Sequence, residues 1–191
     1  VTGNLNSDNW LTNYNQIINK NLIIKKPLRS KKVGISTTFK NFLFGIAYKS
    51  PLLGIYEHSF EKENNWRLDF LRYEFEYLRL LFILIKSMPD INFVIRPHPH
   101  ESKYIWRILC KKIKNLELSK EISLKKWLKD KSICINSFST TSIDTAMQGI
   151  PCLSLDNLIS KKTYDRLPNN KIPFIAEFSL RPNTLSEAEE V

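Results

Sequence analysis

The sequence predicts an α/β fold, a Rossmann-like three-layer domain with a mostly parallel sheet. From residue 91 onward, short apolar runs alternate with helix-like segments, which is typical of βαβ units with right-handed crossovers. The chain has 191 residues, of which 42% are hydrophobic and 25% charged. These values fit one large globular domain and exclude a disordered or low-complexity chain.

The expected elements follow from periodicity and from residues that end helices. A strand is expected over 32–37 and the clearest helix over 66–87, ended by Pro89. The apolar stripe expected on that helix is Leu68, Leu71, Phe75, Leu78, Phe82 and Ile85. Further strands are expected at 91–95, 132–135 and 152–155, and further helices at 101–114, 124–129 and 140–148.

The charge and the cysteine content indicate which partners and which cellular compartment to expect. Lys and Arg number 29 against 19 Asp and Glu, a formal net charge of +10, which suits an anionic ligand, a nucleic acid or an anionic membrane face. Apolar runs are far shorter than the roughly 20 residues that span a bilayer. Three scattered cysteines favour a reducing compartment over a disulfide framework or zinc cluster. We therefore expect a cytoplasmic protein, with peripheral contact at the inner face of the cell membrane.

From the two ends of the chain we expect the sequence to be a fragment of a longer protein. It begins at Val1 and stops within a polar, helix-favouring stretch. We expect residues 1–30 to link from a missing amino-terminal domain and residues 31–191 to form the Rossmann-like domain.

The first loop of chemical interest, residues 96–101, follows the strand expected at 91–95. Its sequence is Arg-Pro-His-Pro-His-Glu. Ligands of open α/β sheets bind at the carboxyl ends of the strands. Two prolines stiffen the loop, Arg96 and His98 supply donors, and the next helix presents N–H groups, a combination that suits phosphate. We expect Glu101 to cap the start of that helix.

The second such loop follows the strand expected at 132–135. It supplies Asn136 and a hydroxyl cluster of Ser139, Thr140 and Thr141. Hydroxyls at a helix start cap the helix and can join its N–H groups in holding phosphate oxygens. Asp144 lies about one turn into the helix, where it could accept hydrogen bonds from ribose hydroxyls. Neither loop is a Gly-rich phosphate cradle, and no metal-ligand spacing is present, so no metal is expected.

Several blocks carry a family resemblance. "VIRPHPHE", "LKKWLKD" and "CINSFSTTSIDTAMQGIPCLSL" resemble the carboxyl-terminal half of bacterial surface-polysaccharide (capsule and O-antigen type) biosynthesis glycosyltransferases of GT-B architecture. The opening "VTGNLNSD" and the closing "FSLRPNTLSEAEE" are similar to the corresponding segments of that family.

The resemblance implies that this half holds a nucleotide-sugar donor as substrate, without a further cofactor. Arg96 and His98 would contact and stabilise the leaving phosphate, and the 139–141 hydroxyls would help to bind it. Asp144 takes the place of the acidic residue that binds the ribose. The acceptor would be a glycan or a lipid-linked molecule. The catalytic base is unassigned, and the resemblance places it mostly in the missing domain. Phe138 departs from the family, which tends to have glycine there.

Three alternatives remain open from the sequence. A nucleotide-sugar epimerase-like enzyme shares the architecture, but the chain lacks the Gly-Gly pair and double carboxylate usual there. A basic nucleic-acid-binding domain would suit the charge, yet no RRM-, KH- or finger-like pattern is present, so nucleic acid is not an expected partner. The third alternative is a non-catalytic scaffold domain.

Overall fold

The computed structural model describes residues 30–39, 60–99, 101, 103–137, 139–167 and 179–191, and these residues confirm the α/β fold. Within them, five parallel strands form one sheet in the order β3-β2-β1-β4-β5. The strands are β1 (Lys32–Ser36), β2 (Asn92–Arg96), β3 (Leu116–Leu118), β4 (Ile133–Asn136) and β5 (Cys152–Leu153). This order is that of a Rossmann-like sheet.

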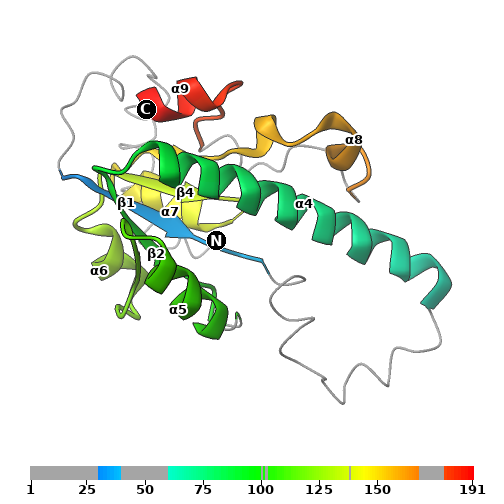
Figure 1. The fold of residues 1–191 in the computed structure, drawn as a ribbon, viewed down its shortest axis with the longest axis horizontal. Coiled ribbons are helices and arrows are strands. Elements are labelled where there is room, and N and C mark those ends of the chain that lie inside the picture. The colour runs from blue at the N-terminus through cyan, green and yellow to red at the C-terminus, as the bar shows by residue number, and fades with distance from the viewer. Residues whose placement is uncertain (1–29, 40–59, 100, 102, 138, 168–178) are drawn as a thin grey trace, which may run out of the picture.

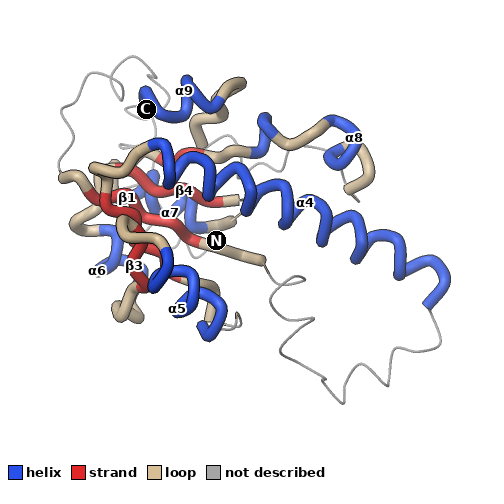
Figure 2. Tube along the Cα trace, in the orientation of Figure 1, coloured by secondary structure: helices blue, strands red, loops and turns tan. Residues whose placement is uncertain are grey.

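Helices cover both faces of the sheet and make three layers (Figures 1 and 2). The larger core contains side chains of α4 (Phe60–Ser87), α5 (Lys103–Lys112) and α9 (Leu185–Glu190). A smaller core on the opposite face contains Trp127 and Leu128 of α6 (Leu124–Leu128). The remaining helices are α7 (Thr141–Met147), the 3₁₀ turn η2 (Asp156–Leu158) and α8 (Lys161–Tyr164). No helix within the described ranges has both the length and the apolar character needed to cross a membrane.

Most expected elements are confirmed with small shifts of their ends. The main exceptions are α4, which begins six residues earlier than expected, and β5, which has only two residues. The strand β3 was not predicted, because three residues at the sheet edge are too few to show alternation. The segment expected to link from an upstream domain lies outside the described residues except for Ser30, whose main-chain N–H donates to Ser132 Oγ at 2.8 Å.

The apolar stripe expected on α4 is partly wrong. Phe75 is 50% exposed, whereas Tyr73 and Tyr77 are 3% and 1% exposed. The helix is therefore rotated so that its tyrosines face the sheet, where Tyr77 Oη donates to the main-chain oxygen of Asn136 at 2.5 Å. Tyrosine combines apolar area with a hydroxyl that finds a buried partner, which a purely apolar periodicity does not detect.

Gly34 lies in the central strand β1 and faces α6. A Cβ atom on Gly34 would lie 2.8 Å from Cη2 and 3.0 Å from Cζ2 of Trp127. Because the Trp127 side chain is 2% exposed, its ring packs directly on the backbone of the central strand.

This contact predicts that Gly34→Ala lowers the free energy of unfolding by about 1–3 kcal/mol through overpacking, measurable by urea denaturation. Trp127→Leu should relieve part of that loss in the double variant. The control is Gly149→Ala, where φ is 66° and no atom lies within 4 Å of the added Cβ. It should cost about 1–2 kcal/mol from its left-handed backbone alone, with no coupling to Trp127→Leu. Additive losses for Gly34→Ala and Trp127→Leu would contradict the packing described.

Candidate functional site

Three neighbouring strands end in a row of polar side chains. Ser36 of β1 is in register with Arg96 of β2 on one side and with Asn136 of β4 on the other. Two residues earlier, Val94 and Cys134 belong to the smaller core. Because side chains alternate along a strand, the three polar residues face the α6 and α7 side of the sheet. We call Arg96, Ser36 and Asn136 the polar row.

The polar row lies at the topological switch point of the sheet. From β1 the chain continues to β2 on one side, and it later returns to β4 on the other side of β1. Loops leaving β1 and β4 therefore diverge at this point, which is where ligands of open α/β sheets bind. Neighbouring strands are about 4.8 Å apart, so the three side chains lie side by side. Arg96 is half-buried, whereas Ser36 and Asn136 are only 6% and 2% exposed.

The turn after β4 covers the middle of the polar row. Thr141 Oγ1 lies 3.2 Å from Ser36 Oγ, and Ser139 Oγ donates to Thr141 Oγ1 at 3.0 Å. The main-chain N–H of Thr141 donates to Ser139 Oγ at 3.2 Å. Thr140 is exposed and its side chain makes no capping bond. The cap expected from the hydroxyl cluster is thus made by Ser139, and the buried hydroxyls of Ser139 and Thr141 hold the turn on the strand.

Asn136 carries a polar atom without a partner. Its side chain is 2% exposed, and Nδ2 has no hydrogen-bond partner within the described part of the chain. An amide donor buried in this way carries a desolvation cost of about 1–3 kcal/mol. Native proteins satisfy nearly all buried donors, and Asn136 Nδ2 is one of three such unpartnered atoms among the described residues, with Trp127 Nε1 and Arg181 Nε. Its place at the carboxyl end of β4 makes it a candidate donor to a bound molecule.

Charged groups lie beside the polar row. Arg96 is half-buried, and its Nη2 donates to the main-chain oxygen of Ile122 at 2.9 Å. Burial raises the pKa of Asp144, and the positive charge of Arg96 opposes that rise. The two side chains therefore lie within electrostatic reach of each other. His98 is half-buried in the loop after β2, and its main-chain oxygen accepts from the N–H of Glu101 at 2.8 Å.

Glu101 has a different role from the expected helix cap. Its side chain is 4% exposed. It accepts hydrogen bonds from Thr37 Oγ1 at 2.6 Å, from the Phe39 main-chain N–H at 2.9 Å and from Trp106 Nε1 at 3.1 Å, and a further one from the main chain of His98. The capping expectation is wrong because α5 begins only at Lys103. This carboxylate instead joins the exits of β1 and β2 on the α5 face of the sheet.

A second buried network fixes the exit of β4. Tyr73 Oη lies 2.5 Å from Ser137 Oγ and also donates to the carboxylate of Asp156. Ser154 Oγ donates to the other oxygen of Asp156 at 2.5 Å. Burial raises the pKa of Asp156, although the bonds from Ser154 and Tyr73 oppose that rise. Sequence reasoning missed this network, whose one visible signal was a polar pair, Ser154 and Asp156, directly after a short strand.

Of the predicted site residues, the structure brings Arg96, Asn136, Ser139, Thr141 and Asp144 to one edge of the sheet on the α7 side. Thr140 lies exposed beside them, and His98 lies in the adjoining loop. Sequence reasoning missed Ser36, the centre of the polar row. Among the described residues, no three His, Cys, Asp or Glu side chains are grouped to hold a metal ion.

Comparison with known proteins returns no matching family model, no matching curated protein and no matching solved structure.

The Glu101 contacts predict a clear loss of stability in Glu101→Ala. The substitution leaves the Thr37 hydroxyl and the N–H groups of Phe39 and Trp106 without their acceptor. The free energy of unfolding should fall by on the order of 3 kcal/mol in urea denaturation. The matched control is Glu117→Ala on β3, where the exposed side chain should change the value by about 0.5 kcal/mol or less. Equal effects of the two variants would contradict the role of Glu101.

A pH dependence follows from the same carboxyl group. Burial raises the pKa of Glu101 above its ordinary value of 4.5, opposed by the hydrogen bonds it accepts. The folded state therefore holds this proton more tightly than the unfolded state, and stability falls as pH rises from about 4.5 through the raised pKa. Glu101→Gln cannot titrate, so the stability of the wild type relative to this variant should decrease over that range. Urea denaturation between about pH 4 and pH 7 measures the difference, and a constant or growing difference would contradict the assignment.

Proposed function

We propose that this chain binds the nucleotide-activated sugar donor of a glycosyltransferase that acts in bacterial surface-polysaccharide synthesis. The polar row, with the unpartnered amide of Asn136 at the switch point of a parallel sheet, supports this proposal most directly. The resemblance of the 96–101 and 136–144 blocks to that enzyme family names the ligand class.

The donor diphosphate would lie against the polar row. A guanidinium has five N–H donors in a planar fork that suits phosphate oxygens, and one donor of Arg96 is bonded to Ile122. The Asn136 amide would donate to a second phosphate oxygen. Asp144 would accept from the ribose hydroxyls at the α7 side, and a bound ribose would supply the donors that this partly buried carboxylate needs.

In glycosyl transfer these residues would stabilise the leaving group. As the bond from the sugar to the phosphate breaks, negative charge grows on the departing nucleotide. Arg96 and His98 would stabilise it with donors that are already oriented, and loss of one such donor typically raises the barrier by about 2.7–4 kcal/mol. A glycan or lipid-linked acceptor, and a domain upstream that supplies the base, complete the proposal. The reaction would take place in the cytoplasm, near the inner face of the membrane.

Calorimetric titration with UDP, CDP, GDP and CMP tests the proposal. We expect at least one nucleotide to bind and Arg96→Gln to weaken that binding about tenfold or more, the loss of one charge-assisted contact. The matched control is Arg107→Gln on the outer side of α5, which should bind as the wild type does. Failure of all four nucleotides to bind would contradict the proposal.

Asn136→Leu separates a ligand-binding role from a structural one. Replacing a buried amide whose Nδ2 has no partner by an apolar group of similar size removes the desolvation cost of that donor, so the free energy of unfolding should stay equal or rise. Nucleotide binding should nevertheless fall, because the donor is gone. A variant that loses stability and keeps full nucleotide affinity would show that the amide serves the fold alone.

A further inference from the structure

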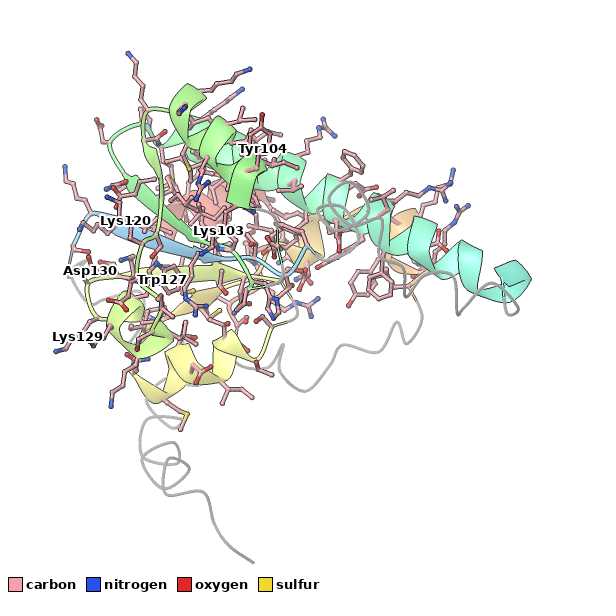
Figure 3. The ribbon with its side chains drawn as sticks, turned by 90° about the horizontal axis from the view of Figure 1, so that it is seen from below. Lys103, Tyr104, Lys120, Trp127, Lys129 and Asp130 are labelled. Atoms are coloured by element: carbon pink, nitrogen blue, oxygen red, sulfur yellow. The ribbon has the colours of Figure 1, made fainter. Side chains whose placement is uncertain are left out.

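The outer half of α5 carries only basic, aromatic and aliphatic side chains. Four of the ten residues of this helix are Lys or Arg, and none is acidic. On a helix with 3.6 residues per turn these cations share one half of the surface with Tyr104 and Ile108, which are 69% and 38% exposed. The exposed residues of this half, which we call the α5 face, are Lys103, Tyr104, Arg107, Ile108, Lys111 and Lys112. Figure 3 shows Lys103 and Tyr104 on this helix.

The fold uses the cations of the α5 face only in part: Lys111 and Lys112 stand in the last turn, where the helix dipole favours positive charge, whereas Lys103 and Arg107 have no such support. None of them forms a salt bridge with the described carboxylates. Lys103 stands in the first turn of the helix, where the helix dipole disfavours a positive charge, and no acidic residue offsets it there. A sequence that breaks such a local rule without an internal partner indicates a function for the charge.

The exposed apolar residues distinguish between anionic partners. A nucleic acid would be recognised by cations with aromatic stacking platforms. The α5 face has one such side chain, Tyr104, whereas its other exposed apolar residue, Ile108, is aliphatic and stacks on no base. The interface of an anionic bilayer takes up tyrosine at headgroup level and aliphatic side chains just below it, while Lys and Arg contact the lipid phosphates. The other side of α5 is anchored by Trp106, which is 1% exposed, so the helix presents its basic face without leaving the domain.

We infer that the α5 face docks the protein on an anionic lipid bilayer, with Tyr104 and Ile108 at the lipid interface and Lys103, Arg107, Lys111 and Lys112 on the headgroups. The docking rests on α5 alone and does not depend on the proposed nucleotide site. Because α5 follows directly after the loop 96–101, docking would also hold that loop close to the membrane surface.

Co-sedimentation of the full chain with vesicles tests the inference. We expect binding to phosphatidylcholine vesicles that contain about 30% phosphatidylglycerol, and weak binding to phosphatidylcholine alone. Each cation near an anionic surface strengthens binding about fivefold, so Lys103→Gln with Arg107→Gln should weaken it roughly thirtyfold. The matched control is Lys125→Gln with Lys126→Gln on α6, across the sheet, which should have a much smaller effect. Equal losses in the two double variants would contradict docking through α5.

Tyr104→Ser with Ile108→Ser tests the apolar contribution and leaves every charge in place. We expect weaker binding to the anionic vesicles and a native circular-dichroism spectrum with a slightly lower melting temperature, since Tyr104 is 69% exposed and Ile108 only 38%. Full retention of vesicle binding, or displacement of the vesicles by an equal concentration of single-stranded RNA, would overturn the assignment to a membrane. Nucleotide titration of the same variants is the separate readout of the proposed function, and it should be unchanged.

Discussion

The parallel register of β1, β2 and β4 is the constraint on which the candidate site depends. Ser36, Arg96 and Asn136 come from parts of the chain up to 100 residues apart, yet the ladders bring them side by side at the ends of three strands. A one-residue slip of any strand would turn its polar residue toward the larger apolar core. The same register explains the close packing at Gly34. This glycine lies two positions before Ser36 on the same side of β1, and its lack of a side chain leaves room for the Trp127 ring.

Buried polar groups then hold the loops that leave these strands. Glu101 joins the exits of β1 and β2 on the side of the sheet that α4 and α5 cover. Asp156, with Tyr73 of α4 and Ser137, fixes the exit of β4. Both carboxyl groups have a raised pKa because of burial, so the fold accepts an electrostatic cost at each. The hydrogen bonds that each carboxylate accepts offset that cost, and the loops that leave the strands are held in place.

The sequence predicted the layered fold because buried parallel strands appear as short apolar runs, and it predicted Arg96 and Asn136 because each ends such a run. Ser36 could not be predicted as a site residue from local sequence, because strand pairing places it beside Arg96 and Asn136, which are far away in the chain. Glu101 was assigned to the nearest helix because local rules do not show contacts with Thr37, which lies 64 residues away. The rotation of α4 was missed because tyrosines, which bury rings and bond through hydroxyls, do not count in an apolar stripe. The unpartnered amide of Asn136 is visible only in three dimensions.

Binding of nucleotide phosphates at the polar row can be read directly from the side-chain amide resonances of Asn136. In ¹⁵N-labelled protein, titration with the tightest-binding nucleotide should shift the Asn136 Nδ2 signals as its donor gains an acceptor. The internal reference is Asn115, whose Nδ2 already donates to the main-chain oxygens of Ile85 and Met88 at 2.8 and 3.0 Å. Its signals should stay in place. Saturation with nucleotide that leaves the Asn136 signals unmoved would contradict phosphate binding at the polar row.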